Sequence, residues 1–211
     1  MKEWIPAIAA SRKNFDVKKG ELLFKEGEVV TGIYFVYRGS VKVHKKWGEK
    51  ELIVRFAKAG DIVGHRGLGN DIIYPISATA LEPSTVCFIE LDFFKSSLKV
   101  NHDFLYWLMM FFAEELKVSE RKMRNLAHMQ VKGRIAQALL TIREKFGTAG
   151  EGHINIELAR QDIASYAGTT YETVFRIMNE FVHDKIIHIA GKRISILNNE
   201  KLTGYTKESE V

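Results

Sequence analysis

One stretch decides the fold of the C-terminal part of this chain: Arg160-Gln-Asp-Ile-Ala164-Ser-Tyr-Ala-Gly168-Thr-Thr170-Tyr-Glu172-Thr-Val174-Phe-Arg176-Ile-Met-Asn179. The small side chain of Ala164 permits two helices to cross closely, and Gly168 can adopt the left-handed conformation of a tight turn. Thr169 or Thr170 can cap the second helix. The stretch therefore predicts two helices between Arg160 and His183, joined as a helix-turn-helix.

The second helix has one apolar face and one polar face. Its apolar stripe consists of Val174, Ile177, Met178 and Phe181. Burying this stripe directs Tyr171, Glu172 and Arg176 outward. An arginine offers a bidentate fork to guanine and a glutamate accepts from the amino group of cytosine, so these three side chains are predicted to read DNA bases. The alternative is a surface ion pair between Glu172 and Arg176, worth only about 0.3 kcal/mol.

A hairpin follows the two helices. It is expected over Ile186 to Leu197, turning at Ala190-Gly191-Lys192. A helix-turn-helix with an appended hairpin is the winged form of the motif. Side chains at the helix starts and at the hairpin tip are predicted to contact DNA phosphates, which fix register without reading sequence. These are Arg160, Thr170, Thr173, Lys192 and Arg193.

The region from Lys18 to about Leu91 has a different texture, with short runs of β-branched and aromatic residues separated by glycines. The expected strands are Leu22 to Phe24, Gly32 to Tyr37, Ser40 to His44, Glu51 to Phe56, Asp61 to Val63, Ser77 to Ala80 and Thr85 to Ile89. The glycines between them are Gly20, Gly27, Gly39, Gly48, Gly60 and Gly64. This spacing predicts an N-terminal β-roll or jelly roll, and the whole chain is expected to be α+β.

Helices are expected after Leu91, namely Asp92 to Val100, His102 to His128 and Gly133 to Phe146. The long helix carries apolar residues at alternating spacings of four and three, with Ser119 as the one polar position. They are Leu105, Met109, Phe112, Leu116, Met123 and Leu126. Leu108, Phe111 and Val118 form a second apolar face. We therefore predict a parallel dimer seam; the alternative is that the first face packs on the chain's own barrel.

These elements suggest three segments: a sensor domain over residues 1–101, a dimerisation helix over 102–128 and a winged helix-turn-helix over 129–211. Positive and negative side chains nearly balance from Met129 onward, so the net charge of +5 says little about DNA. The longest apolar run, Phe104 to Ala113, is too short to span a bilayer. With a single cysteine, Cys87, no internal disulfide is possible. A cytoplasmic protein without a membrane segment is expected.

On these residues the chain resembles the cyclic-AMP receptor protein and FNR family of bacterial regulators, from about Lys18 to Leu197. The resemblance rests on Arg160-Gln-Asp-Ile, Gly168, Glu172-Thr-Val and Arg176. The family's Arg-Glu-Thr-Val appears here as Tyr171-Glu-Thr-Val174, so Glu172 and Arg176 inherit base contacts while specificity shifts at Tyr171. The resemblance implies a homodimer on inverted-repeat DNA, with RNA polymerase as a further partner.

The ligand cassette that the resemblance implies departs from the pattern of that family. Cyclic-nucleotide binders carry Gly-Glu and later Arg followed by Ser or Ala, whereas this chain has Gly64-His65-Arg66-Gly67 and Ile76-Ser77-Ala78. His65 replaces the acid for the ribose hydroxyl, and Ile76 replaces the arginine for the cyclic phosphate, which removes a charge-assisted contact. We expect no cyclic-nucleotide cofactor and an unidentified small-molecule effector or none.

Other kinds of sensor, and functions other than DNA binding, would each require particular residues. A single cysteine cannot hold a cysteine-ligated iron–sulfur cluster, and haem would need an axial ligand such as His44, His65 or His102. A cupin-type metalloenzyme would need clustered ligands, but this region offers only His44 and His65. A purely structural dimer module would not explain Glu172 and Arg176. The expected protein is therefore a regulator, not an enzyme, with no metal site.

Overall fold

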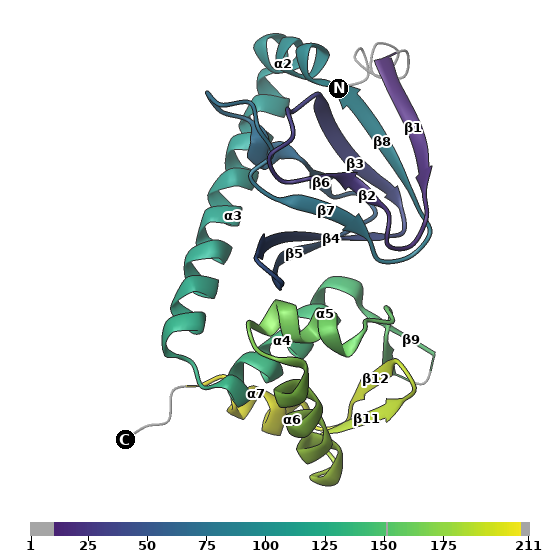
Figure 1. The fold of residues 1–211 in the computed structure, drawn as a ribbon, viewed down its shortest axis with the longest axis vertical. Helices are drawn as coiled ribbons and strands as arrows, with labels where there is room; N and C mark the ends of the chain where they lie inside the picture. Colours follow the sequence, from purple (N-terminus) through teal and green to yellow (C-terminus); the bar gives the residue numbers. More distant parts are fainter. Residues whose placement is uncertain (1–10, 151, 208–211) are drawn as a thin grey trace. The chain divides into compact units, whose positions relative to one another are not determined.

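A computed structural model describes residues 11–150 and 152–207 of the chain (Figure 1). The chain forms two compact units that divide between Lys117 and Val118, inside the long helix α3 (His102–His128). Each unit has its own core. Among the described residues no helix is long and apolar enough to cross a membrane.

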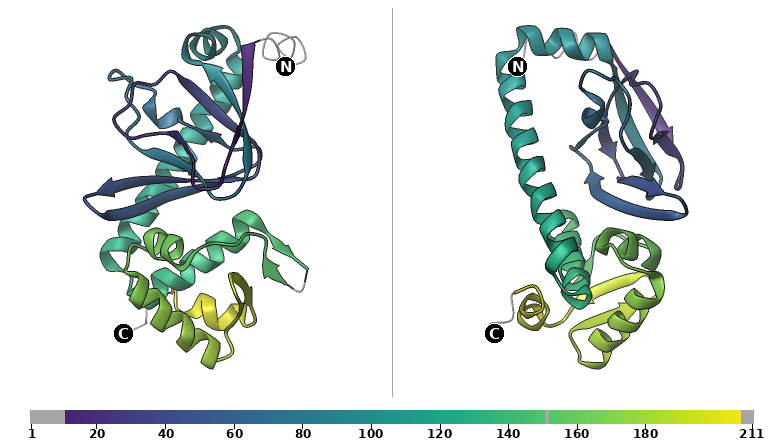
Figure 2. Two further views of the ribbon diagram at one scale, coloured as in Figure 1. Left: turned by 45° about the vertical axis from the view of Figure 1, so that its right-hand side comes forward. Right: turned by 60° about the vertical axis from the view of Figure 1, so that its left-hand side comes forward.

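The first unit is a roll of two four-stranded sheets, visible from two further sides in Figure 2. One sheet has the order β1-β8-β3-β6 and the other β2-β7-β4-β5. The strands are β1 (Arg12–Val17), β2 (Leu22–Phe24), β3 (Gly32–Arg38), β4 (Ser40–Trp47), β5 (Lys50–Lys58), β6 (Ile62–Val63), β7 (Ser77–Ala80) and β8 (Ser84–Glu90). All strand pairs are antiparallel.

Two apolar clusters hold this unit together. The cluster inside the roll includes Phe24, Val41, Val63 and Ala78 from both sheets, all almost fully buried. A second cluster joins the sheet to helix α2 (Leu91–Val100) and to the start of α3. Burying such side chains stabilises a fold by roughly 1.5–3 kcal/mol each. The roll and the first half of α3 therefore form one packed body.

The second unit combines helices with a small sheet. Its helices are α4 (Val131–Phe146), α5 (Arg160–Ala167), α6 (Tyr171–His183) and α7 (Asn199–Gly204). Its sheet has the order β11-β12-β10-β9, from β9 (Thr148–Ala149), β10 (His153–Ile154), β11 (Ile187–Ala190) and β12 (Arg193–Ile196). The hairpin β11–β12 turns at Gly191 and Lys192, as expected.

The α+β fold and its principal elements are confirmed, and six predicted turn glycines of the roll all have positive φ. Strand β1 was not predicted, because its side chains are mostly exposed and give no apolar alternation. It forms through backbone pairing with β8 at the edge of the sheet. Strand β9 and helix α7 were also missed; α7 is capped by Asn198, whose side chain accepts from Lys201 N–H at 2.9 Å.

Candidate nucleic-acid interface and sensor cluster

The turn between α5 and α6 has the geometry of a helix-turn-helix. Gly168 ends α5 in the left-handed conformation (φ 65°, ψ 47°), and its N–H donates to the carbonyl of Ala164. A side chain at this φ would be strained, which explains the glycine. Thr170 is the cap of α6, because its hydroxyl oxygen accepts from Thr173 N–H at 3.3 Å. Of the two predicted cap candidates, the structure uses Thr170.

The two faces of α6 are as sharply divided as the sequence predicted. The stripe of Val174, Ile177, Met178 and Phe181 is buried, with at most 2% of each side chain exposed. Tyr171, Glu172 and Arg176 lie on the solvent side. Phe175 lies there too, with 53% of its surface exposed and its ring stacked 6.3 Å from that of Tyr171.

Arg176 forms an ion pair, but with a different partner from the one considered from sequence. Its Nη1 donates to Glu180 Oε1 at 2.6 Å, one turn further along α6. Lys132 of α4 donates to the other oxygen of Glu180 at 3.0 Å. This hydrogen bond and the two nearby cations lower the pKa of Glu180. Within the described residues Glu172 makes no ion pair, so its carboxylate faces solvent unopposed.

The predicted phosphate contacts fall into two groups. Thr170 and Thr173 lie together at the start of α6, their hydroxyl oxygens 3.1 Å apart. Arg160 begins α5 and donates to the carbonyl of Gly191 at 3.3 Å, which joins the first helix to the tip of the hairpin. At that tip Lys192 is exposed, and Arg193 pairs with Glu157 at 3.1 Å.

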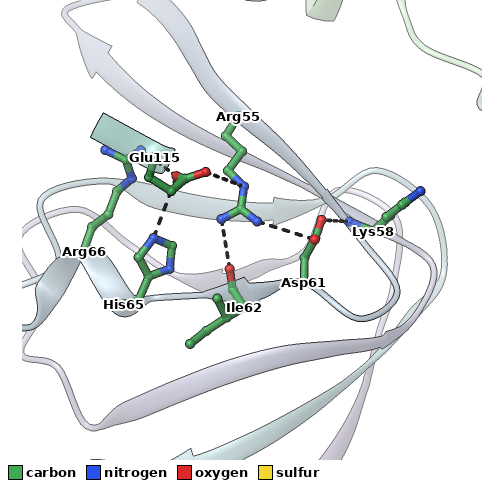
Figure 3. Close-up of polar contacts among 7 residues, drawn as sticks. All are labelled: Arg55, Lys58, Asp61, Ile62, His65, Arg66 and Glu115. Carbon is green, nitrogen blue, oxygen red and sulfur yellow. Dashed lines mark hydrogen bonds and ion pairs between the residues drawn. The ribbon is translucent and has the colours of Figure 1, made fainter. Parts of the chain in front are cut away.

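In the first unit, Figure 3 shows a group of polar and charged side chains between the roll and α3. Gly64 takes positive φ and leads into a short 3-10 helix, His65–Gly67. Arg66 from that helix donates to Glu115 of α3 at 2.8 Å, and Arg55 Nε of β5 lies 3.6 Å from the other Glu115 oxygen. We call Arg55, Asp61, His65, Arg66 and Glu115 the sensor cluster.

Arg55 is held from two further sides. Its Nη1 donates to the carbonyl of Ile62 at 3.1 Å, and Nη2 lies 3.7 Å from Asp61 (Figure 3). Asp61 in turn accepts from Lys58 N–H at 2.8 Å. The guanidinium is thus matched by carboxylates of the same chain.

His65 is the most deeply placed member of the sensor cluster, with 2% of its surface exposed. Burial first, then the guanidinium groups of Arg55 and Arg66, lower its pKa to about 3. Its ring packs edge-on against Phe111 and Phe112 of α3, and Nε2 lies 3.9 Å from Glu115. At neutral pH the imidazole is therefore uncharged.

The remaining cassette positions are tied into the roll. Ile76 is 6% exposed and belongs to the apolar cluster inside the roll. The hydroxyl oxygen of Ser77 accepts from Glu26 N–H at 2.9 Å. Of the other two histidines considered as haem ligands, His44 is buried between Thr79 and Glu51, at 2.8 and 3.1 Å, and His102 is exposed.

The long helix α3 uses its two apolar faces differently. Leu108 is 3% exposed and Phe111 is half-buried, and both pack in the cluster that joins sheet to helix. The predicted seam instead faces outward. Leu105, Met109, Leu116 and Met123 are 45–62% exposed, Phe112 is 37% exposed and Leu126 is half-buried. The second face, except the exposed Val118, supplies the intrachain contact, so the first face is left uncovered.

Comparison with known proteins matches both units. Residues 15–101 match the cyclic nucleotide-binding domain, and residues 133–205 match the Crp-like helix-turn-helix domain. The fumarate and nitrate reduction regulatory protein of Yersinia pestis is 30% identical over 189 residues, which cover 88% of this chain and 75% of that protein. The chain belongs to the CRP/FNR family of DNA-binding transcription regulators.

A second relative supports this assignment, and a solved structure shares the fold. The cAMP-activated global transcriptional regulator CRP of Salmonella typhimurium is 31% identical over 180 residues, covering 82% of this chain and 84% of that protein. The structure of FixK2 from Bradyrhizobium japonicum shares the fold, with a TM-score of 0.84, 24% identity and coverage of 94% of this chain and 98% of that one. Both of the curated relatives are regulatory proteins.

Sequence reasoning missed three residues that shape these CRP/FNR sites. Phe175 lies on the outer face of α6, and the sequence analysis assigned it to neither face of the helix. Glu180 lies four residues after Arg176, a spacing that is itself a signal for an ion pair. Glu115 lies 49 residues after Arg66, and no sequence pattern indicates that they meet.

Proposed function

We propose that this regulator recognises an inverted DNA repeat through Tyr171, Glu172 and Arg176 on the outer face of α6. The observation that carries the proposal is the position of this face, which is exposed behind a glycine turn and a threonine cap. An arginine in the major groove forms two parallel hydrogen bonds with guanine. Arg176 must first leave Glu180, but such a surface ion pair contributes little to stability.

The experiment is the change Arg176→Ala in the full chain, with binding measured to a selected site and to unrelated DNA. Specific binding is expected to weaken by about 1–3 kcal/mol while non-specific binding stays nearly constant. Lys201→Ala removes an equal charge from an exposed position of α7 and serves as the control. Equal loss on both DNAs after Arg176→Ala would remove the base-reading role.

We also propose that five side chains contact DNA phosphates, namely Arg160, Thr170, Thr173, Lys192 and Arg193. The support is their position, because they lie at the starts of α5 and α6 or at the tip of the β11–β12 hairpin. Lys192→Ala should weaken binding to all DNA sequences alike and lower the slope of affinity against salt by about 1. An unchanged salt slope would place Lys192 outside the interface.

We further propose a parallel homodimer whose α3 helices pair along the exposed seam. Two such helices would hold the winged units about one DNA turn apart, roughly 34 Å. Leu116→Glu places a charge on the seam and should yield a monomer in sedimentation equilibrium, because a charge opposite its copy is repelled and desolvated. Lys117→Glu, one residue along and off the seam, should stay dimeric. A dimeric Leu116→Glu protein would rule out this seam.

For the effector, we propose that cyclic AMP is not the signal. The residues do not fit the ligand: apolar Ile76 stands where its phosphate would need a cation, and Arg66 is engaged by Glu115. Calorimetry should detect no micromolar cyclic-AMP binding that activates DNA binding. Such binding would overturn this proposal, and a haem absorption band in purified protein would favour a haem sensor through His44, His65 or His102.

RNA polymerase is proposed as a partner and the cytoplasm as the location. The support is that a transcription regulator acts on polymerase at the chromosome. Purified polymerase should bind a DNA fragment that carries the selected site more tightly when the regulator is present. Equal binding of polymerase to this DNA with and without the regulator would contradict the proposed partnership.

A further inference from the structure

A cavity in the second unit lies among the second half of α3, α4 and α5. Its volume is about 320 Å³. Small-molecule sites generally measure roughly 300–1,000 Å³, so this space suits a ligand of a few heavy atoms. Its walls come from the helix that carries the dimer seam and from the first helix of the helix-turn-helix.

The charges that line this cavity are mostly positive. Arg121 and Lys122 project from α3 and Arg134 from α4, against one carboxylate among the lining residues, that of Glu144. The other polar walls are neutral, such as Gln137, whose amide donates to Thr141 at 3.1 Å. The balance favours an anion, and two arginines and a lysine are the groups that bind phosphate-like anions best.

Lys122 occupies an unusual place for an ammonium group. Its Nζ lies 3.8 Å from the centre of the Tyr166 ring, a cation–π contact across the cavity wall. Burial lowers the pKa of Lys122 to about 7. An anion beside it would favour the charged form and return this pKa toward its ordinary range.

Arg134 connects the cavity to the DNA-reading motif. One of its terminal nitrogens donates to the carbonyl of Leu126 near the end of α3 at 2.9 Å. The other donates to the carbonyl of Gly168 in the turn at 3.3 Å. Its buried Nε has no hydrogen-bond acceptor among the described residues. This donor set has spare capacity, and the weaker of its two bonds goes to the turn.

We propose that this cavity binds a tetrahedral dianion, a phosphate or sulfate group, through Arg121, Lys122 and Arg134. The bound anion draws Arg134 from the carbonyl of Gly168 and loosens the turn before α6. The site thus gives the DNA-binding unit an effector of its own, distinct from the cassette in the roll. The binding step is independent of the proposed DNA contacts, whereas its coupling to DNA rests on them.

The binding step is tested by calorimetry on the full chain with sodium sulfate, at ionic strength held constant with chloride. Sulfate does not titrate near neutral pH, so proton uptake measured in two buffers at pH 7.5 reports on the protein. We expect saturable binding of one sulfate per chain with uptake of part of a proton. The sign follows from Lys122, which is partly neutral at pH 7.5 and becomes charged beside the anion, so affinity rises as pH falls from 8 to 6. The charged and titratable groups that face Lys122 across the cavity are Arg121, Arg134, Glu144 and Tyr166.

Variants separate this site from general screening. Lys122→Gln should weaken sulfate binding at least tenfold and abolish proton uptake, and exposed Arg121→Gln should weaken it about tenfold without risk to folding. Lys117→Gln, an exposed lysine on the same helix whose partner is Glu114, is the control and should change neither. Non-saturable binding, or equal weakening by all three changes, would overturn the site.

Two further arms complete the test. Glycerol 3-phosphate in place of sulfate distinguishes the source of the anion: tighter binding points to an organic phosphate, equal binding to the free ion. At constant ionic strength, saturating sulfate should weaken specific DNA binding about fivefold or more, and Lys122→Gln should remove this effect. Sulfate binding with unchanged DNA affinity would overturn the coupling alone.

Discussion

The outer face of α6 and the sensor cluster are both rich in charged or polar groups, but they differ in whether these groups have partners within the chain. On α6, Glu172 faces solvent unopposed and Phe175 is half exposed. In the sensor cluster, Arg55 and Arg66 are both engaged by Glu115 of the same chain. Exposed side chains without a partner in the chain are available to bind another molecule, whereas side chains that form ion pairs and hydrogen bonds with each other contribute to stability. The difference predicts where substitutions alter binding and where they alter folding.

The largest effect is expected from a substitution in the core of the second unit. Phe181 is fully buried on the inner face of α6, so Phe181→Ala should destabilise the second unit by about 3–5 kcal/mol through lost contacts and a cavity. All three tryptophans precede Val118. Unfolding by denaturant should therefore show an earlier transition by circular dichroism and an unchanged one by tryptophan fluorescence. A common shift in both signals would mean that the two units unfold as one.

A smaller effect is expected in the sensor cluster. Glu115→Gln removes the charge that faces Arg66 and Arg55 and should lower the free energy of unfolding by about 2 kcal/mol, because the partly buried guanidinium of Arg66 loses its carboxylate partner and Arg55 keeps only Asp61. Glu114→Gln is the matched control. Its exposed pair with Lys117 should change stability by less than about 1 kcal/mol. Equal effects in the two variants would contradict the burial of the sensor cluster.

The acid sensitivity of the protein is expected to reside in the sensor as well. The pKa of His65 is lowered to about 3, below the value of about 6.5 for an unfolded chain. The unfolded state thus binds the proton more tightly, so stability is present above pH 6.5 and lost as pH falls toward 3. From pH 7 to pH 5 this loss is roughly 2 kcal/mol. His65→Gln should flatten the pH dependence by this amount in denaturant titrations, and an unaltered slope would contradict the neutral buried imidazole.

The smallest effect is expected from Glu180 on α6. Glu180→Ala frees Arg176 and removes a carboxylate that would lie near DNA phosphates. Specific affinity should rise by about twofold, because a surface ion pair contributes little. Fluorescence anisotropy with a labelled site resolves a change of this size. Weaker binding would show that Glu180 positions Arg176 for DNA instead of withholding it.

The sequence predicted those elements whose signals are local. Gly168, the cap at Thr170 and the stripe from Val174 to Phe181 each act within one or two helical turns, and the structure has them as expected. Strand β1 carries no such signal, because it exists only through pairing with β8, about seventy residues away. The sequence analysis named His65 and Arg66 as cassette positions, but it did not predict the sensor cluster that they form with Glu115. Glu115 lies on α3, far from Arg66 in the sequence, and only the folded structure places the two side chains in contact.

An apolar residue type indicates burial correctly in the roll but not at one position of α6. Ile76 is buried as its type suggests, whereas Phe175 is exposed beside Tyr171. The helical period places position 175 on the outer face, so the period predicts its location better than its hydrophobicity does. An aromatic group in this position offers a surface for thymine methyl groups.

Base reading by α6 can be tested by selecting bound sequences from a random DNA pool with the full chain and with its Arg176→Ala variant, without added cyclic AMP. We expect an inverted repeat whose half-site centres are about one helical turn apart, roughly 10 base pairs. The variant should lose preference at one guanine-containing position in each half-site. An absence of enriched sequences, or the same motif from both proteins, would show that Arg176 does not read DNA bases.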